Sequence, residues 1–198
     1  MLNKRSFLAV LFLLVLTACS SERNRQYFGT DITGIDFARG FSLTSHEGKL
    51  VRSEDFKGKL VVLFFGFTYC PEVCPTTLSE FAVALEKMGE EKASEIQVLF
   101  VTIDPQRDDK NRLKNYVTAF NANFLGLTGT DDEIRKTADE YKIVFEKVKI
   151  SEQGDNYTMD HTAGTYISDK QGRPRLYMSY GQDHQKVLHD LELLLGRE

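Results

Sequence analysis

Two apolar runs constrain the fold more than any other feature of this 198-residue sequence. One covers residues 60–67 and is rich in valine and phenylalanine, and the other covers residues 96–103. A strand with one face in water alternates apolar and polar residues, so these runs predict strands that are buried on both faces. Such strands form the centre of an α/β sheet with helices on both sides.

Segments with helical periodicity alternate with these two strands. Apolar residues in them recur at intervals of three and four, and Thr130 and Glu133 have the spacing of a capping box. The expected helices are residues 78–88 ending at Gly89, residues 113–120 opened by Asp108 or Asp109, a helix from Thr130 through Tyr141, and residues 187–195 ending at Gly196.

The remaining apolar segments read as strands. They are a hairpin of residues 41–45 and 50–51, a short piece at 124–127, and strands at 143–150, 163–168 and 175–180, with a polar excursion at 151–157. This order predicts an α/β, thioredoxin-like fold with a central mixed sheet flanked by helices and an N-terminal hairpin.

The N-terminus resembles a bacterial lipoprotein signal. Lys4 and Arg5 precede an apolar run at 7–16 that is short for a membrane span. The residues before Cys19 resemble a lipobox, whose cysteine is lipidated and becomes the first residue, although an uncleaved anchor with a chance cysteine is an alternative. The expected segments are a signal peptide at 1–18, a tether at 19–33 and a folded domain at 34–198.

The charge of the chain excludes one class of partner. The formal net charge is −4, and removal of a leader with Lys4 and Arg5 would make the remainder more acidic. An acidic domain without a basic patch does not fit a nucleic-acid backbone. We therefore expect no nucleic-acid partner.

Cys70 and Cys74 lie where the first buried strand gives way to a helix. Pro71 and Pro75 are tolerated in a first helical turn, because the N–H groups there have no intrahelical partner. The helix dipole and its free N–H groups stabilise a thiolate at this place. Three intervening residues put the sulfurs about one helical turn apart, so the pair can form a disulfide or bind a soft metal ion. A silent buried pair or a static disulfide is the alternative.

His161 is the third candidate ligand. It precedes the strand expected at 163–168, and in a thioredoxin-like domain the loop entering that strand lies against the cysteine turn. Two thiolates and an imidazole form a soft site suited to Cu(I), with Cu(II) also accessible, whereas zinc normally takes a fourth ligand. Asp160 is expected either to orient this histidine or to cap a turn. The other histidines, His46, His184 and His189, are expected to be surface or hydrogen-bonded residues.

Three motifs resemble the SCO/SenC family of copper proteins for cytochrome c oxidase assembly. They lie at residues 66–75, 102–108 and 160–172, and the likeness extends from about Phe41 to the C-terminus. Tyr69 stands where histidine is common in the family, and Glu72 where aspartate is common; neither change removes a ligand. The resemblance implies a thioredoxin fold, copper ligands Cys70, Cys74 and His161, and supporting roles for Asp104 and Asp160.

The same resemblance implies a function and a location. The family delivers copper to the binuclear copper centre of cytochrome c oxidase, or reduces the cysteines of that centre. We expect bound Cu(I) or Cu(II), and as partner the copper-bearing oxidase subunit or another exported copper protein. We also expect a monomeric domain outside the bacterial cell membrane, attached to the membrane by a lipid on Cys19.

Two other activities use a cysteine pair. A thiol–disulfide oxidoreductase would use Cys70 and Cys74 and would not need His161. A peroxiredoxin-type peroxidase would place a threonine three residues before Cys74, where this chain has Pro71, so the hydroxyl for peroxide binding is missing. A metallochaperone that is not an enzyme remains the main hypothesis, with the oxidoreductase as its alternative.

Overall fold

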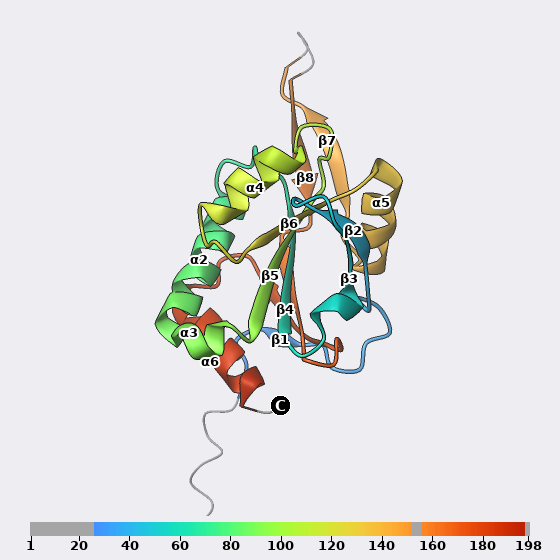
Figure 1. Cartoon of the computed structure of the whole chain (residues 1–198). Coiled ribbons are helices and arrows are strands. Elements are labelled where there is room, and N and C mark those ends of the chain that lie inside the picture. The colour runs from blue at the N-terminus through green and yellow to red at the C-terminus, as the bar shows by residue number, and fades with distance from the viewer. Residues whose placement is uncertain (1–25, 152–155, 197–198) are drawn as a thin grey trace, which may run out of the picture.

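The computed structural model describes residues 26–151 and 156–196 and contains an eight-stranded mixed sheet with helices on both faces (Figure 1). The strands are β1 (Thr30–Asp31), β2 (Ser42–Ser45), β3 (Leu50–Arg52), β4 (Leu60–Gly66), β5 (Ile96–Thr102), β6 (Leu125–Thr128), β7 (Phe145–Lys149), β8 (Tyr157–His161), β9 (Gly164–Ser168) and β10 (Pro174–Ser179). The helices are α2 (Val73–Met88), α3 (Glu90–Ala93), α4 (Lys110–Thr118), α5 (Asp131–Glu140) and α6 (His184–Leu195), with a short 3₁₀ helix at Ser53–Phe56.

The sheet has the order β1-β10-β9-β4-β5-β6-β2-β3, and β7 and β8 form a separate two-stranded sheet. Strands β4 and β5 are parallel neighbours at the centre, and both are buried on both faces, as their apolar runs predict. Alternate residues of β4 enter two cores: Val62 and Phe64 pack with α2 and α6, whereas Leu63 and Phe65 pack with α5. The mixed, thioredoxin-like α/β sheet is therefore confirmed.

Several local predictions are also confirmed. The N-terminal hairpin forms as β2 and β3, and Thr130 and Glu133 make the capping box of α5. Of the two candidates for the start of α4, Asp109 is the cap, because its side chain accepts the backbone N–H of Arg112. Asp108 has a different role in the site described below.

Part of the tether predicted at residues 19–33 contacts the folded domain. The backbone N–H groups of Phe28 and Gly29 donate to the carboxylate of the buried Asp190 in α6, at 2.9 and 2.7 Å. Strand β1 then pairs with β10. The predicted signal peptide and Cys19 lie outside the described residues, and no helix within those residues is long and apolar enough to span a membrane.

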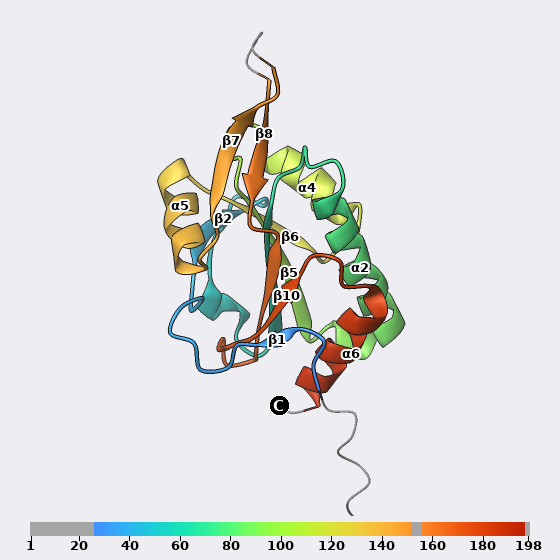
Figure 2. The same cartoon turned by 180° about the vertical axis from the view of Figure 1, so that it is seen from behind.

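The sequence predicts strands at 143–150 and 163–168, but the structure has a further strand between them. Residues 157–161, expected to be a loop, form β8 and pair with β7 in an antiparallel hairpin. This hairpin projects from the end of the main sheet where β4 meets α2 (Figures 1 and 2). His161 is therefore the last residue of a strand, and its position depends on how the hairpin is attached.

Candidate metal and thiol site

The cysteine pair lies at the carboxyl end of β4. Cys70 ends the loop after β4, and Cys74 is the second residue of α2, whose backbone N–H points to the Cys70 sulfur at 3.4 Å. The Cys74 side chain is completely buried, whereas Cys70 is partly exposed, and both are free thiols. The expected pair at a helix start is thus present, with one accessible sulfur and one enclosed sulfur.

Gly66 makes room for the enclosed sulfur. A Cβ atom at this position would lie 2.7 Å from the Cys74 Sγ and 2.8 Å from a ring carbon of Phe100. No side chain fits there without displacing one of these groups. The last residue of β4 is therefore glycine because the sulfur packs against the strand itself.

The two thiols have opposite acidities. A hydrogen bond from the Cys74 thiol, together with backbone N–H groups of Glu72, Val73 and Cys74, lowers the pKa of Cys70 to about 5. The same hydrogen bond and burial raise the pKa of Cys74. At neutral pH Cys70 is a thiolate, which is the form that binds metal or attacks a disulfide, and Cys74 carries a proton.

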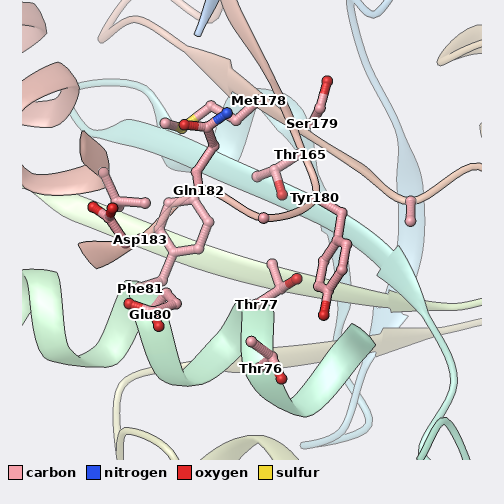
Figure 3. Close-up of a pocket in the computed structure, with 13 residues that line it drawn as sticks. Thr76, Thr77, Glu80, Phe81, Thr165, Met178, Ser179, Tyr180, Gln182 and Asp183 are labelled. Carbon is pink, nitrogen blue, oxygen red and sulfur yellow. The ribbon is translucent and has the colours of Figure 1, made fainter. Parts of the chain in front are cut away.

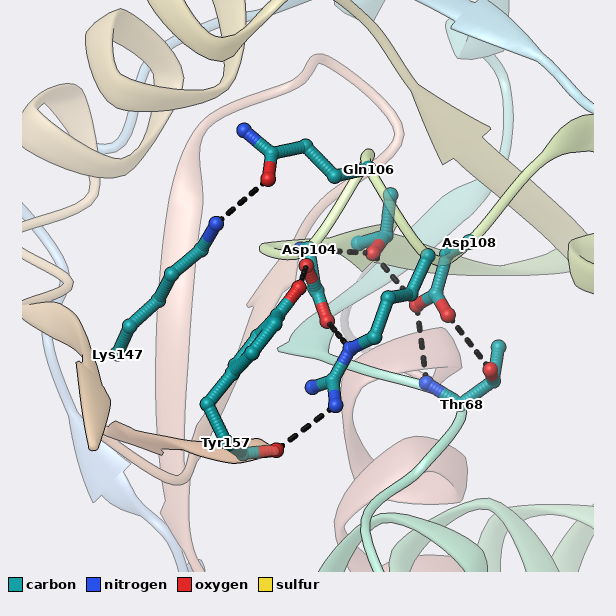
Figure 4. Close-up of polar contacts among 8 residues, drawn as sticks. Thr68, Asp104, Gln106, Asp108, Lys147 and Tyr157 are labelled. Atoms are coloured by element: carbon teal, nitrogen blue, oxygen red, sulfur yellow. Dashed lines mark hydrogen bonds and ion pairs between the residues drawn. The ribbon is translucent and has the colours of Figure 1, made fainter. Parts of the chain in front are cut away.

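Asp108 fixes the loop that carries Cys70 (Figure 4). Its buried carboxylate accepts the Thr68 N–H at 2.9 Å, the Thr68 hydroxyl at 2.6 Å and the Thr102 hydroxyl at 2.7 Å. Burial raises the pKa of Asp108, while the hydrogen bonds from Thr68 and Thr102 oppose that shift. This role of Asp108 was not predicted from the sequence, because an Asp just before a helix is also typical of an N-cap.

Asp104 acts on the site through Arg107 and Tyr157, and within the described residues it makes no contact with either cysteine. It is buried, forms an ion pair with Arg107, and accepts the Tyr157 hydroxyl at 2.8 Å (Figure 4). The Arg107 guanidinium donates to the Tyr157 carbonyl at 2.8 Å and lies 3.7 Å from the Tyr157 ring and 4.8 Å from the Tyr69 ring. This group connects the cysteine loop to β8.

Lys147 makes a second connection between the hairpin and the loop after β5. Its ammonium group donates to the side-chain oxygen of Gln106 at 2.6 Å (Figure 4). The pair is exposed, so it adds little stability. The main polar attachment of the hairpin is thus through Tyr157, and Phe145 and Met159 add apolar contacts with the core.

His161 lies near the cysteine loop without joining the two sulfurs in a metal cluster. Its ring packs edge-on against Phe67, with the ring centroids 6.0 Å apart. Within residues 26–151 and 156–196, no group of three Cys, His, Asp or Glu side chains is close enough to hold a metal ion. A Cys₂His site therefore requires the His161 side chain to lie closer to the two sulfurs than it does in this structure.

The hydrogen bond of the His161 ring leaves its Nε2 atom available as a metal ligand. Its Nδ1 lies 3.0 Å from the carbonyl oxygen of Thr162. A carbonyl only accepts hydrogen bonds, so Nδ1 carries the proton and Nε2 keeps its lone pair. Asp160 is exposed and points to the opposite face of β8, since side chains alternate along a strand. The expectation that Asp160 orients His161 is not supported by any contact.

The other three histidines are hydrogen-bonded to residues other than the cysteines, as expected. His46 Nδ1 accepts the backbone N–H of Gly126 at 3.0 Å. His184 and His189 lie on α6 and pair with Glu80 and Asp190, each at 3.0 Å. None of the three faces the cysteine turn through these contacts.

A small cavity opens beside the first turns of α2. It has a volume of about 140 Å³, and its walls include Thr76, Thr77 and Glu80 of α2 and Tyr180 and Gln182 after β10 (Figure 3). No sequence motif marks this cavity, because its lining comes from α2, β9 and the segment between β10 and α6. It gives the side of α2 next to the cysteines a concave, mainly apolar surface.

A thioredoxin-like α/β domain with two cysteines one turn apart at a helix start defines a class of thiol-based metal-binding and redox proteins. Within this class, the SCO1/SenC family model matches residues 30–196, and the chain belongs to that family. The SCO2-like protein of Rickettsia felis is 36% identical over 133 residues, which are 67% of this chain and 64% of the relative's length.

Two solved structures resemble the whole folded domain. The structure of Bradyrhizobium japonicum ScoI with copper bound is 35% identical, with a TM-score of 0.72 over 80% of this chain and 99% of that one. The solution structures of apo Sco1 from Thermus thermophilus are 36% identical, with a TM-score of 0.76 over 85% of this chain and 97% of that one. The family resemblance and the thioredoxin-like fold expected from the sequence are thus confirmed.

Proposed function

We propose that this chain binds copper through Cys70, Cys74 and His161 and delivers it to the copper-bearing subunit of cytochrome c oxidase or to another exported copper protein. The observation that carries the proposal is the Cys70 thiolate next to Cys74 at the start of α2. Two thiolates bind Cu(I), and an added imidazole nitrogen makes Cu(II) binding favourable as well. The copper-bound Bradyrhizobium ScoI supports this choice of metal.

The donor set favours copper over harder ions. Sulfur ligands select soft ions, and within the described residues no group of three Cys, His, Asp or Glu side chains forms a site for a harder ion. Because Cys74 is protonated in the apo form, metal binding releases its proton. Disulfide formation and metal binding exclude each other, because an oxidised pair has no sulfur free to become a thiolate ligand.

Titration with copper tests this proposal. The reduced protein should bind one Cu(I) or one Cu(II) per chain, and the fully oxidised protein should bind neither appreciably. Thiol counting before and after mild oxidation establishes the redox state. Undiminished copper uptake by the oxidised protein would refute the role of the cysteine pair.

A thiol–disulfide oxidoreductase is the second candidate. The asymmetry of the pair favours it, because Cys70 is an accessible thiolate that can attack and Cys74 is an enclosed thiol that can resolve a mixed disulfide. Turnover of a protein disulfide by the copper-free protein tests this activity. His161→Ala should leave that turnover unchanged, whereas a copper carrier loses Cu(II) binding with the same change.

We also propose that a lipid on Cys19 holds the domain on the outer side of the bacterial membrane. The apolar run at 7–16 and the lipobox-like residues before Cys19 support this location. Cys19→Ser should leave an unprocessed precursor without acyl chains. A variant with the mass and the membrane partition of the wild type would contradict lipidation.

A further inference from the structure

The β7–β8 hairpin has one face toward the domain and one face toward solvent. Phe145, Met159 and Tyr157 lie on the inner face and contact the core around β4, and His161 lies on the same face. Side chains alternate along paired strands, so the neighbouring positions form an outer face. The residues of this outer face are Val144, Glu146, Val148, Ile150, Thr158 and Asp160.

The outer face exposes three branched apolar side chains close together. Val144, Val148 and Ile150 are 74%, 39% and 67% exposed. Val148 lies in β7, Val144 and Ile150 directly precede and follow that strand, and Glu146 lies between the two valines. Lone exposed apolar residues are ordinary, but a row of three branched side chains on a projecting hairpin is typical of an interaction surface. The face therefore lacks a cover in the described chain.

Two carboxylates occupy the middle of this row. Glu146 and Asp160 are directly opposite each other in the hairpin register, and both are exposed. Like charges at directly opposite positions destabilise a strand pair. No Lys, Arg or His of the described residues forms an ion pair with either one. A cation brought by another molecule would remove this repulsion.

The position of the hairpin restricts what can cover it. The described chain begins beside α6, at the end of the domain opposite the hairpin (Figures 1 and 2). A membrane anchor before residue 26 thus attaches at the far end, and the two carboxylates repel anionic lipids. A second copy would place the same negative pair against its own, which electrostatic complementarity disfavours.

We propose that the outer face of the β7–β8 hairpin docks the protein that accepts copper, through a Lys or Arg of that protein surrounded by apolar side chains. The cation would lie between Glu146 and Asp160, and the apolar groups would cover Val144, Val148 and Ile150. This inference rests on the proposed function. Docking here contacts the strand that carries His161, so the acceptor engages the element that holds the third proposed copper ligand.

Glu146→Lys tests the docking face without disturbing the fold. The new lysine faces Asp160, so it replaces a repulsion with an ion pair and should leave the hairpin as stable as before. Glu91→Lys on α3 is the matched control, because it makes the same change of net charge at an exposed site near the other end of the domain. Both variants keep all three proposed copper ligands.

The probe is the purified copper-bearing domain of the oxidase subunit, and binding is measured by calorimetry at low and moderate salt. Glu146→Lys should weaken binding at least tenfold and reduce its salt dependence, whereas Glu91→Lys should stay within about twofold of the wild type. Copper affinity should be equal in all three proteins. Val148→Ser should also weaken binding, without a change in salt dependence.

The possible failures are distinguishable. A wild type that binds no copper refutes the proposed function. A wild type that binds copper and the probe, with Glu146→Lys equal to Glu91→Lys, overturns the docking face alone. A copper-loaded wild type that does not bind the probe also overturns it. Self-association, or binding to phosphatidylcholine vesicles, that Val148→Ser abolishes would assign the face to another occupant and contradict the proposal.

Discussion

The cysteine turn and the β7–β8 hairpin contribute to the same proposed site but are built differently. The turn is enclosed by Gly66 and α2, and two hydrogen bonds from Thr68 fix it to Asp108, whose carboxylate also accepts the Thr102 hydroxyl of β5. The hairpin projects from the sheet (Figure 2), and Val144, Glu146, Ile150 and Asp160 of its outer face are exposed. Its main polar link to the domain is Tyr157 with Asp104 and Arg107.

The difference separates two tasks. Two sulfurs that are already close can capture Cu(I) with little rearrangement, which keeps the ordering cost of binding low. The third donor lies on an element with fewer contacts, and such elements open with smaller free energies than a buried sheet. Under the proposed function, three donors hold the copper ion, and withdrawal of the third donor releases it.

The largest expected effect comes from removing the Asp108 carboxylate, which fixes the cysteine turn. Asp108→Ala leaves the Thr68 N–H and two hydroxyls without their acceptor, so the free energy of unfolding should fall by about 3 kcal/mol. Asp108→Asn keeps an acceptor and should lose about 1 kcal/mol. Urea unfolding of the reduced proteins measures both. Equal stability of wild type and Asp108→Ala would show that the turn does not depend on this carboxylate.

Gly66→Ala attacks the same side through packing. The added methyl group collides with the Cys74 sulfur and Phe100, so the variant should lose about 1–3 kcal/mol of stability and bind Cu(I) more weakly. Gly196→Ala is the control, since its Cβ would meet its nearest neighbour at an ordinary 3.4 Å. Thermal unfolding and Cu(I) competition assays give the two quantities. A stable Gly66→Ala protein with full affinity contradicts the close packing of Cys74.

Tyr157→Phe should loosen the hairpin and leave the turn intact. The change removes the hydrogen bond to Asp104 but keeps the ring against Arg107, so global stability should fall by no more than about 1 kcal/mol. Amide hydrogen exchange in residues 145–149 should accelerate, while exchange in β4 and β5 stays slow. Tyr166→Phe, which removes a buried bond to the Tyr141 carbonyl, should not accelerate the hairpin. Uniform acceleration throughout the sheet would contradict a separately attached hairpin.

The smallest perturbation is a change of pH. Since the pKa of Cys70 is lowered to about 5, its alkylation by iodoacetamide should be half-maximal near that pH and level above about pH 6. Cys74, with a raised pKa and no exposed surface, should remain unmodified in the folded protein. Mass spectrometry after timed quenching distinguishes the two. A rate that still rises tenfold per pH unit up to pH 8 would contradict the thiolate.

The sequence predicts the cysteine turn better than the β7–β8 hairpin. The apolar run of β4, the helical period of α2 and the proline-flanked cysteines are local signals, and they place Cys70 and Cys74 correctly. The Thr130–Glu133 capping box is local in the same sense, because both bonds close within four residues.

The missed features depend on contacts between distant segments. Asp108 binds Thr68 across 40 positions, and an Asp beside a second Asp near a helix start indicates a cap first. Strand β8 alternates Tyr157, Met159 and His161 with polar residues, but a five-residue stretch after a polar segment reads as a loop. The resemblance points to His161 as a ligand, but the separation of its ring from the sulfurs emerges only from the folded hairpin.

The most direct test of the central claim is the absorption spectrum of the Cu(II) form of His161→Ala. We predict that the thiolate-to-copper band vanishes or shifts and that Cu(II) affinity falls at least ~100-fold. Loss of a residue that only hydrogen-bonds to a metal ligand already lowers metal affinity by about 10–100-fold, and loss of a ligand itself should lower it further. Cu(I) should weaken yet persist on the two thiolates, and His46→Ala should retain both forms. A His161→Ala protein with wild-type Cu(II) spectrum and affinity would contradict the Cys₂His site and favour the oxidoreductase.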